Sequence, residues 1–67
     1  MSKFLRITDH AGKETVVNAN YVVALQFDRR DNGATLLVAQ ANSEGARGKM
    51  LLVEEEANRV ETWLLSL

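Results

Sequence analysis

The spacing of apolar residues changes near residue 53, and this change restricts the possible folds more than any other feature of the chain. Beyond this point apolar residues recur at intervals of three and four, as on one side of an amphipathic helix. Earlier in the chain they alternate with polar residues or form short β-branched runs, which is typical of strands. The pattern predicts an α+β protein whose only helix comes last. The apolar stripe of that helix consists of Val53, Ala57, Val60, Leu64 and Leu67, with Trp63 beside them.

Turn-forming residues divide the part before the helix into short strands. Proline is absent, so Gly, Asn and Asp mark the turns. The first turn is expected at Asp9 to Gly12, and Asn18 to Asn20 should bend the chain into the third strand. Asp31-Asn32-Gly33 is the clearest hairpin signal, because Asn-Gly readily adopts a type I′ turn. A polar loop is expected from Asn42 to Gly48.

We predict an antiparallel β-meander of about five strands followed by one C-terminal amphipathic helix. The 67 residues should form a single domain, residues 1–67, because a chain of this length has no room for two hydrophobic cores. The predicted strands are roughly residues 3–8, 13–18, 21–28, 34–41 and 49–53, and the predicted helix is roughly 54–66.

The small size of the domain limits how it can be stabilised. A chain of this length buries only about 60% of the surface that its unfolded form exposes. There is no cysteine for a disulfide, and His10 is the only histidine, so a structural zinc site is not expected. No other metal or cofactor site is assigned from the sequence. Stability should therefore come from a well-packed core, from a partner subunit, or from both.

Charge and hydropathy indicate a cytoplasmic protein without a membrane partner. Eight Lys and Arg residues face nine Asp and Glu residues, which gives a net charge of −1, so the chain offers no long-range attraction for nucleic acid or anionic lipid. Lys3 and Arg6 interrupt the apolar N-terminus, which excludes a signal-peptide core. No apolar run approaches the roughly 18 residues that a membrane span needs.

No arrangement of side chains predicts catalysis. His10 lies beside Asp9 in a predicted turn, but no nucleophile stands at a catalytic spacing from it. Gly45 and Gly48 lack the lysine and serine spacing of a phosphate-binding loop. The acidic triplet Glu54 to Glu56 is expected to complement the dipole of the helix N-terminus, with a metal or partner site as the alternative. We therefore expect no enzyme, no catalytic residue and no cofactor.

Four cationic residues are the candidate nucleic-acid contacts: Arg29, Arg30, Arg47 and Lys49. In a meander the first pair lies at a hairpin tip and the second pair at the opposite end of the sheet, so they should not form one basic patch. Phe4, Tyr21 and Phe27 could stack on bases. Their apolar neighbours favour core packing instead.

Both faces of the two middle strands are unusually apolar. One side carries Val23, Leu25, Phe27, Leu36 and Val38, and the other carries Val22, Ala24, Leu37 and Ala39. A single helix covers only one face of a small sheet. We therefore predict that the chain is a homo-oligomer and that Val22, Ala24, Leu37 and Ala39 form its self-association face. A strongly curled sheet that buries both faces on itself, as in small barrels, is the competing explanation.

The order of these segments resembles a known family. It comprises a charged start at Phe4 to Thr8, a Gly turn, the run Val16 to Val23, an Asn-Gly hairpin, and Leu51 to Glu55 leading into a short helix. This order is similar to that of the short bacterial flagellar and swarming-motility proteins of the FlbD-like type and of similar uncharacterised small bacterial proteins. The resemblance covers most of the chain and implies no catalytic residues. The segment from Asn42 to Gly48 is longer and richer in glycine than the tight turn expected in that family.

Three functions from different classes remain open. The apolar sheet faces favour a non-enzymatic interaction module that self-associates through a sheet face or edge, with a different protein as a further possible partner. The second function is a nucleic-acid-binding regulator that uses the four cationic residues. The third is an enzyme or small-molecule binder with a site between subunits, because residues of different chains can meet there without any spacing rule in one chain.

Overall fold

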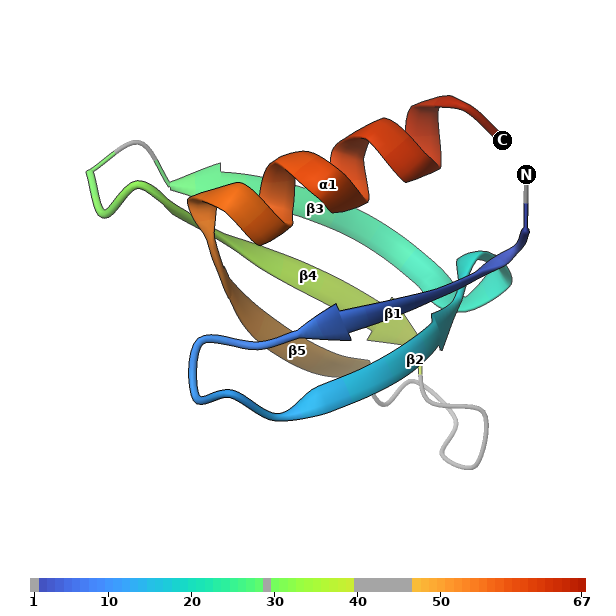
Figure 1. The fold of residues 1–67 in the computed structure, drawn as a ribbon, viewed down its shortest axis with the longest axis horizontal. Helices are drawn as coiled ribbons and strands as arrows, with labels where there is room; N and C mark the ends of the chain where they lie inside the picture. Colours follow the sequence, from blue (N-terminus) through green and yellow to red (C-terminus); the bar gives the residue numbers. More distant parts are fainter. Residues whose placement is uncertain (1, 29, 40–46) are drawn as a thin grey trace.

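Five strands and one C-terminal helix form the part of the chain that the computed structural model describes, residues 2–28, 30–39 and 47–67. The predicted α+β class is confirmed, but the strands form two antiparallel sheets instead of one continuous meander. One sheet contains β1 and β2, and the other has the order β3–β4–β5 (Figure 1). The elements are β1 (Phe4–Thr8), β2 (Glu14–Asn18), the short 3₁₀ helix η1 (Ala19–Tyr21), β3 (Val22–Asp28), β4 (Gly33–Ala39), β5 (Arg47–Val53) and α1 (Glu54–Leu65).

The turn η1 separates the two sheets. The side chain of Asn18 accepts a hydrogen bond of 2.9 Å from the N–H of Asn20, which starts the turn. The N–H of Ala19 donates to the carbonyl of Lys3 at 2.7 Å and so holds the turn against the beginning of β1. The predicted bend is confirmed, but it includes Tyr21. β3 therefore begins at Val22 and pairs with β4 instead of β2.

The two hairpin connections differ in how closely they follow the prediction. In the first, Asp9 Oδ1 accepts the N–H groups of Ala11 and Lys13 at 3.0 and 2.9 Å, and Gly12 has the expected positive φ of 87°. In the second, only the Asn of the Asn-Gly pair has a positive φ, 53° at Asn32. Gly33 is already in β4, where it pairs with Asp28. A two-residue type I′ turn is therefore not formed.

A close approach between strands favours glycine at position 33. A Cβ here would lie 3.1 Å from the carbonyl oxygen of Leu52 on the neighbouring strand, so a side chain would require β4 and β5 to shift by a few tenths of an ångström. At its other end β5 begins at Arg47, inside the loop predicted for residues 42–48. The rest of that loop, together with the end of the predicted strand 34–41, lies outside the described residues.

One hydrophobic core joins both sheets and the helix. Figure 1 shows β1 and β2 crossing in front of β4 and β5, with α1 running along the side between β1 and β3. The inner faces of the sheets therefore share one core, which α1 closes. Ile7, Leu36 and Val60, one from each of these three layers, are completely buried. The full set of buried core residues is Ile7, Val17, Ala34, Leu36, Leu52, Ala57, Val60 and Trp63.

The predicted helix stripe is confirmed in its middle and wrong at its ends. Ala57, Val60 and Trp63 are buried. Val53 instead ends β5 and is 53% exposed, and Leu67 lies beyond the helix, half-exposed. The prediction that Phe4, Tyr21 and Phe27 pack in the core is also wrong, since each is more than 40% exposed.

Side chains of α1 bind the edge of β1. Glu56 Oε2 accepts the N–H of Thr8 at 2.6 Å, and Arg59 donates both to Glu56 and to the carbonyl of Arg6. The glutamate and arginine therefore supply the acceptor and the donor that a neighbouring strand would otherwise supply. At the far end of α1, Trp63 Nε1 donates to the carbonyl of Ser2 at 2.7 Å, which fixes the N-terminal segment to the helix.

Trp63→Ala is expected to lower the free energy of unfolding by about 3–5 kcal/mol, because it leaves a large cavity beside the core. That loss is comparable to the whole stability of many small domains. Trp63→Phe keeps the packing and loses the hydrogen bond to Ser2, so it should cost only about 1 kcal/mol. Urea denaturation measures both variants, with Leu65→Ala as an exposed control on the same helix. A Trp63→Ala protein as stable as the parent would contradict the observed packing.

The contacts of Glu56 predict a loss of stability in acid. The hydrogen bond from Arg59, assisted by the Thr8 N–H, holds the pKa of the Glu56 carboxyl below its ordinary value of 4.5, although partial desolvation opposes this. A lowered pKa in the folded state stabilises the fold above the unfolded pKa. The contribution of the Glu56 charge to the free energy of unfolding should therefore be complete above about pH 4.5. It should disappear as the pH falls through the lower pKa that Glu56 has in the folded state.

Glu56→Gln should cost about 1 kcal/mol at neutral pH. The difference in unfolding free energy between this variant and the parent protein should shrink as the pH falls below the ordinary pKa of a glutamate. In that pH range the parent carboxyl becomes neutral as well. Unfolding free energies measured over this pH range test the expectation. Glu55→Gln removes a charge from an exposed side chain of the same helical turn and serves as the control. A difference that stays constant from neutral to acid pH would show that the Glu56 charge does not hold β1.

Candidate interaction surfaces

The structure places His10 in a turn that contacts the second sheet. His10 is exposed in the first hairpin turn, and its backbone N–H donates to the carbonyl of Leu51 at 2.8 Å. This bond joins the β1–β2 turn to the outer edge of β5. Within residues 2–28, 30–39 and 47–67, no three His, Cys, Asp or Glu residues are grouped so that they could hold a metal ion.

No helix in the described ranges is both long enough and apolar enough to cross a membrane.

The structure does not bring the candidate nucleic-acid contacts together. Arg30 lies in the β3–β4 connection, where its N–H donates to Asp28 Oδ1 at 2.9 Å. Lys49 pairs with Leu37 in the opposite half of the sheet, and Arg47 begins β5 beyond it. Arg29 lies outside the described residues. Arg30 is thus separated from Lys49 by most of the length of the sheet, as the sequence predicted.

A β-bulge alters the predicted self-association face. The register between β3 and β4 shifts between Val22 and Ala24, which inserts Val23 as an extra residue. Val22 therefore pairs with Val38 and packs against the core. The assignment of Val22 to the self-association face is wrong, because strict alternation cannot anticipate an inserted residue. Ala24, Leu37 and Ala39 lie on the face that points away from the core, and their part in self-association stays a prediction.

We call this surface of β3, β4 and β5 the outer face. Two residues that the sequence analysis did not assign to it are Leu51 and Val53, which are 48% and 53% exposed. Leu51 lies in register with Thr35 and Gln26, and Val53 with Gly33 and Asp28. Alternation from Lys49 could have identified both residues, but Val53 had been counted as part of the helix stripe.

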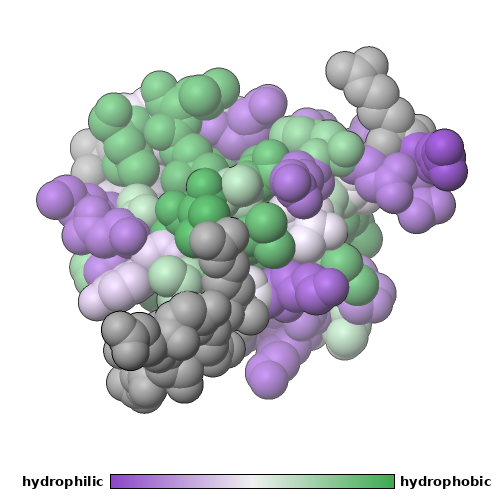
Figure 2. All heavy atoms as spheres, turned by 180° about the vertical axis from the view of Figure 1, so that it is seen from behind, coloured by the Kyte–Doolittle hydropathy of each residue, from purple (hydrophilic) through white to green (hydrophobic). Residues whose placement is uncertain are grey.

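The outer face combines apolar area with a hollow. Figure 2, which views the molecule from the side away from β1 and β2, shows hydrophobic side chains extending from the upper left of the view to its middle, with hydrophilic ones on either side. Near the β3–β4 connection the sheet borders a pocket of about 330 Å³, to which Thr35, Leu51 and Val53 contribute, with His10 and Asp31 also in its lining. This end of the outer face is therefore concave.

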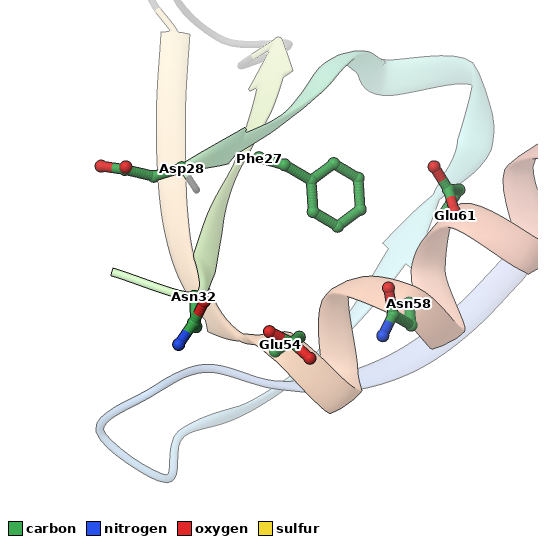
Figure 3. A pocket seen from close by; sticks show the side chains of 6 residues that line it. All are labelled: Phe27, Asp28, Asn32, Glu54, Asn58 and Glu61. Carbon is green, nitrogen blue, oxygen red and sulfur yellow. The ribbon is translucent and has the colours of Figure 1, made fainter. Parts of the chain in front are cut away.

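A second surface is a groove between β3 and α1, which we call the α1–β3 groove. Its larger part is an open pocket of about 500 Å³, lined by Phe27, Asp28, Asn32, Glu54, Asn58 and Glu61. Figure 3 shows the Phe27 ring projecting from β3 into the space beside the helix, with Asn58 and Glu61 on the helical side. A smaller hollow of about 170 Å³ continues along the helix and is lined by Leu25, Phe27, Glu61, Leu64 and Leu65.

The groove has an apolar floor and an acidic rim. Phe27 is 42% exposed and Leu65 is 81% exposed, so both offer apolar surface to a ligand. On the helical side Glu54 and Glu61 supply two carboxylates, whereas neither pocket has a Lys or Arg in its lining. The Asp28 side chain points away from the groove (Figure 3). Sequence analysis missed this site because Phe27 lies in an apolar run that is typical of a core strand, and because the helix is far from β3 along the chain.

Comparison of the chain with protein-family models, with curated proteins and with solved structures gives no match. The resemblance to FlbD-like proteins therefore stays a prediction.

Proposed function

We propose that this protein is a non-enzymatic interaction module that forms homo-oligomers through the outer face of β3–β4–β5. The observation that carries the proposal is the exposure of Leu51 and Val53, each about half accessible, on a sheet face against which no described element packs. The inner face is covered by β1, β2 and α1 together. Apolar side chains grouped on the surface of a small domain usually mark an interaction site, and a second copy of the same face would provide the missing layer.

The dimensions of the outer face predict weak association. Each of its strands has seven residues, so the face is about 23 Å long and, at about 4.8 Å per strand, about 14 Å wide. A face of these dimensions has an area considerably smaller than the roughly 800 Å² per partner that a standard stable interface buries. We therefore expect dissociation constants in the micromolar range or weaker.

The FlbD-like resemblance and the cysteine-free composition support a setting in the bacterial cytoplasm. A second copy on the outer face would also close the pocket beside His10, Leu51 and Val53. This is the arrangement in which the alternative function, binding of a small molecule between subunits, would arise. The nucleic-acid alternative gains no comparable support, because Arg30 and Lys49 lie in opposite halves of the sheet.

Leu51→Lys is expected to weaken self-association by at least roughly thirtyfold, because a charged side chain would replace one of the two most exposed apolar side chains of the interface and be buried there. Sedimentation equilibrium over a range of concentrations should show masses above the 7.5 kDa of one chain for the parent protein and a monomer for the variant. Val16→Lys makes the same change at an exposed position of β2, and it should leave the masses unchanged. A parent protein that stays monomeric up to the highest concentration tested, and binds no hydrophobic dye, rules the proposal out.

A further inference from the structure

β3 has a free edge in the described part of the chain. β4 is the only described strand that pairs with it. The N–H of Val22, at the start of the strand, donates to the carbonyl of Ala19. No other backbone hydrogen bond joins β3 to a described segment outside the β3–β4 ladder. A free edge presents a row of N–H and C=O groups that can pair with another extended chain.

The α1–β3 groove runs beside this free edge. Phe27 and Leu25 project into it from β3, while Leu64 and Leu65 border it from α1. Successive side chains of an extended chain point to opposite sides. A strand added to β3 would therefore place every second side chain in the groove, against apolar surface, while its backbone pairs with the edge. Peptide-binding domains with a groove between an edge strand and a helix use this combination of backbone pairing and side-chain pockets.

The charges around the groove determine which charged side chains of a bound peptide would be attracted to it. Glu54 and Glu61 border it on the helical side. The only cation of α1 is Arg59, which is already bonded to Glu56 and to the carbonyl of Arg6 on β1. Arg30 lies in the lining of a neighbouring hollow next to Asp28. An apolar occupant with Lys or Arg at its ends therefore finds complementary charge along the groove.

A second copy of the chain fits this groove poorly. β3 of another copy, Val22–Asp28, contains no Lys or Arg. Pairing of β3 with β3 would therefore bring no cation of the paired strand to Glu54 and Glu61. The groove therefore requires an occupant different from the one proposed for the outer face.

We propose that the α1–β3 groove binds an extended segment of another protein, apolar at alternate positions and flanked by Lys or Arg, which adds to β3 as a further strand. This site goes beyond self-association, since it uses a different surface and a different partner. Affinity comes from backbone pairing with β3 and from burial of Phe27, and selectivity comes from the acidic rim.

The test uses the synthetic heptapeptide Lys-Val-Thr-Val-Thr-Val-Lys, whose length matches that of β3. Titration into ¹⁵N-labelled protein should give saturable changes in the amide signals of Val23 to Phe27 and of α1 around Glu61. The same peptide with Glu at both ends should bind at least about tenfold more weakly at low salt. N-methylation of alternate residues should abolish binding, because it removes the donors needed for strand pairing.

Variants locate the site on the protein. Glu61→Lys should weaken binding of the Lys-ended peptide about tenfold, whereas Glu14→Lys, the same change at an exposed position of β2, should not alter it. Leu51→Lys should also bind the peptide normally, which separates this site from the outer face. The proposal is overturned if no saturable change occurs, if the changes map away from β3, or if the Glu-ended peptide binds equally well. Concentration-dependent changes in β3 without peptide would assign the groove to a second copy and overturn it as well.

Discussion

The docking of α1 against β1 and the core holds the two sheets together. Among the described residues, the only backbone hydrogen bond between the sheets is the one from His10 to Leu51. The inner faces therefore stay together because their side chains share one core with Ala57, Val60 and Trp63. The polar bonds of Glu56 and Arg59 to β1 set the position of the helix along that strand. Burial provides most of the stabilising free energy, while these directional bonds determine which surfaces remain exposed.

The sequence predicted the elements of the fold well because each element corresponds to a pattern of neighbouring residues. The helix was predicted from its first residue, Glu54, and the turn at Gly12 from the need for a positive φ. The division into two sheets could not be predicted in the same way. It depends on how the η1 turn rotates the chain after Asn18, and residues with the same turn preference would equally well connect two paired strands. Pairing between strands depends on how the whole core packs, and the core is formed by residues from distant parts of the chain.

The candidate surfaces show a similar division between local and non-local information. Ala24, Leu37 and Ala39 were grouped on one face of the sheet, and the structure keeps them together, because alternation holds along most of each strand. Val22 was assigned wrongly, because one inserted residue in β3 reverses the faces on either side of it. The α1–β3 groove was missed entirely. It is formed by residues more than twenty positions apart, and the exposure of Phe27 depends on where the helix lies across the sheet.

α1 contacts the edge of β1 and the edge of β3 in different ways, and this difference is the basis for assigning the groove to a partner. Along β1, Glu56 and Arg59 bind the backbone and so occupy an edge that another chain could otherwise pair with. Along β3, α1 presents Asn58, Glu61 and Leu65, which border the groove without a described bond to the strand backbone. An edge left open beside apolar surface is an aggregation hazard unless charge restricts what can pair with it. The carboxylates of Glu54 and Glu61 impose that restriction, because they attract a basic segment and β3 of another copy carries no Lys or Arg.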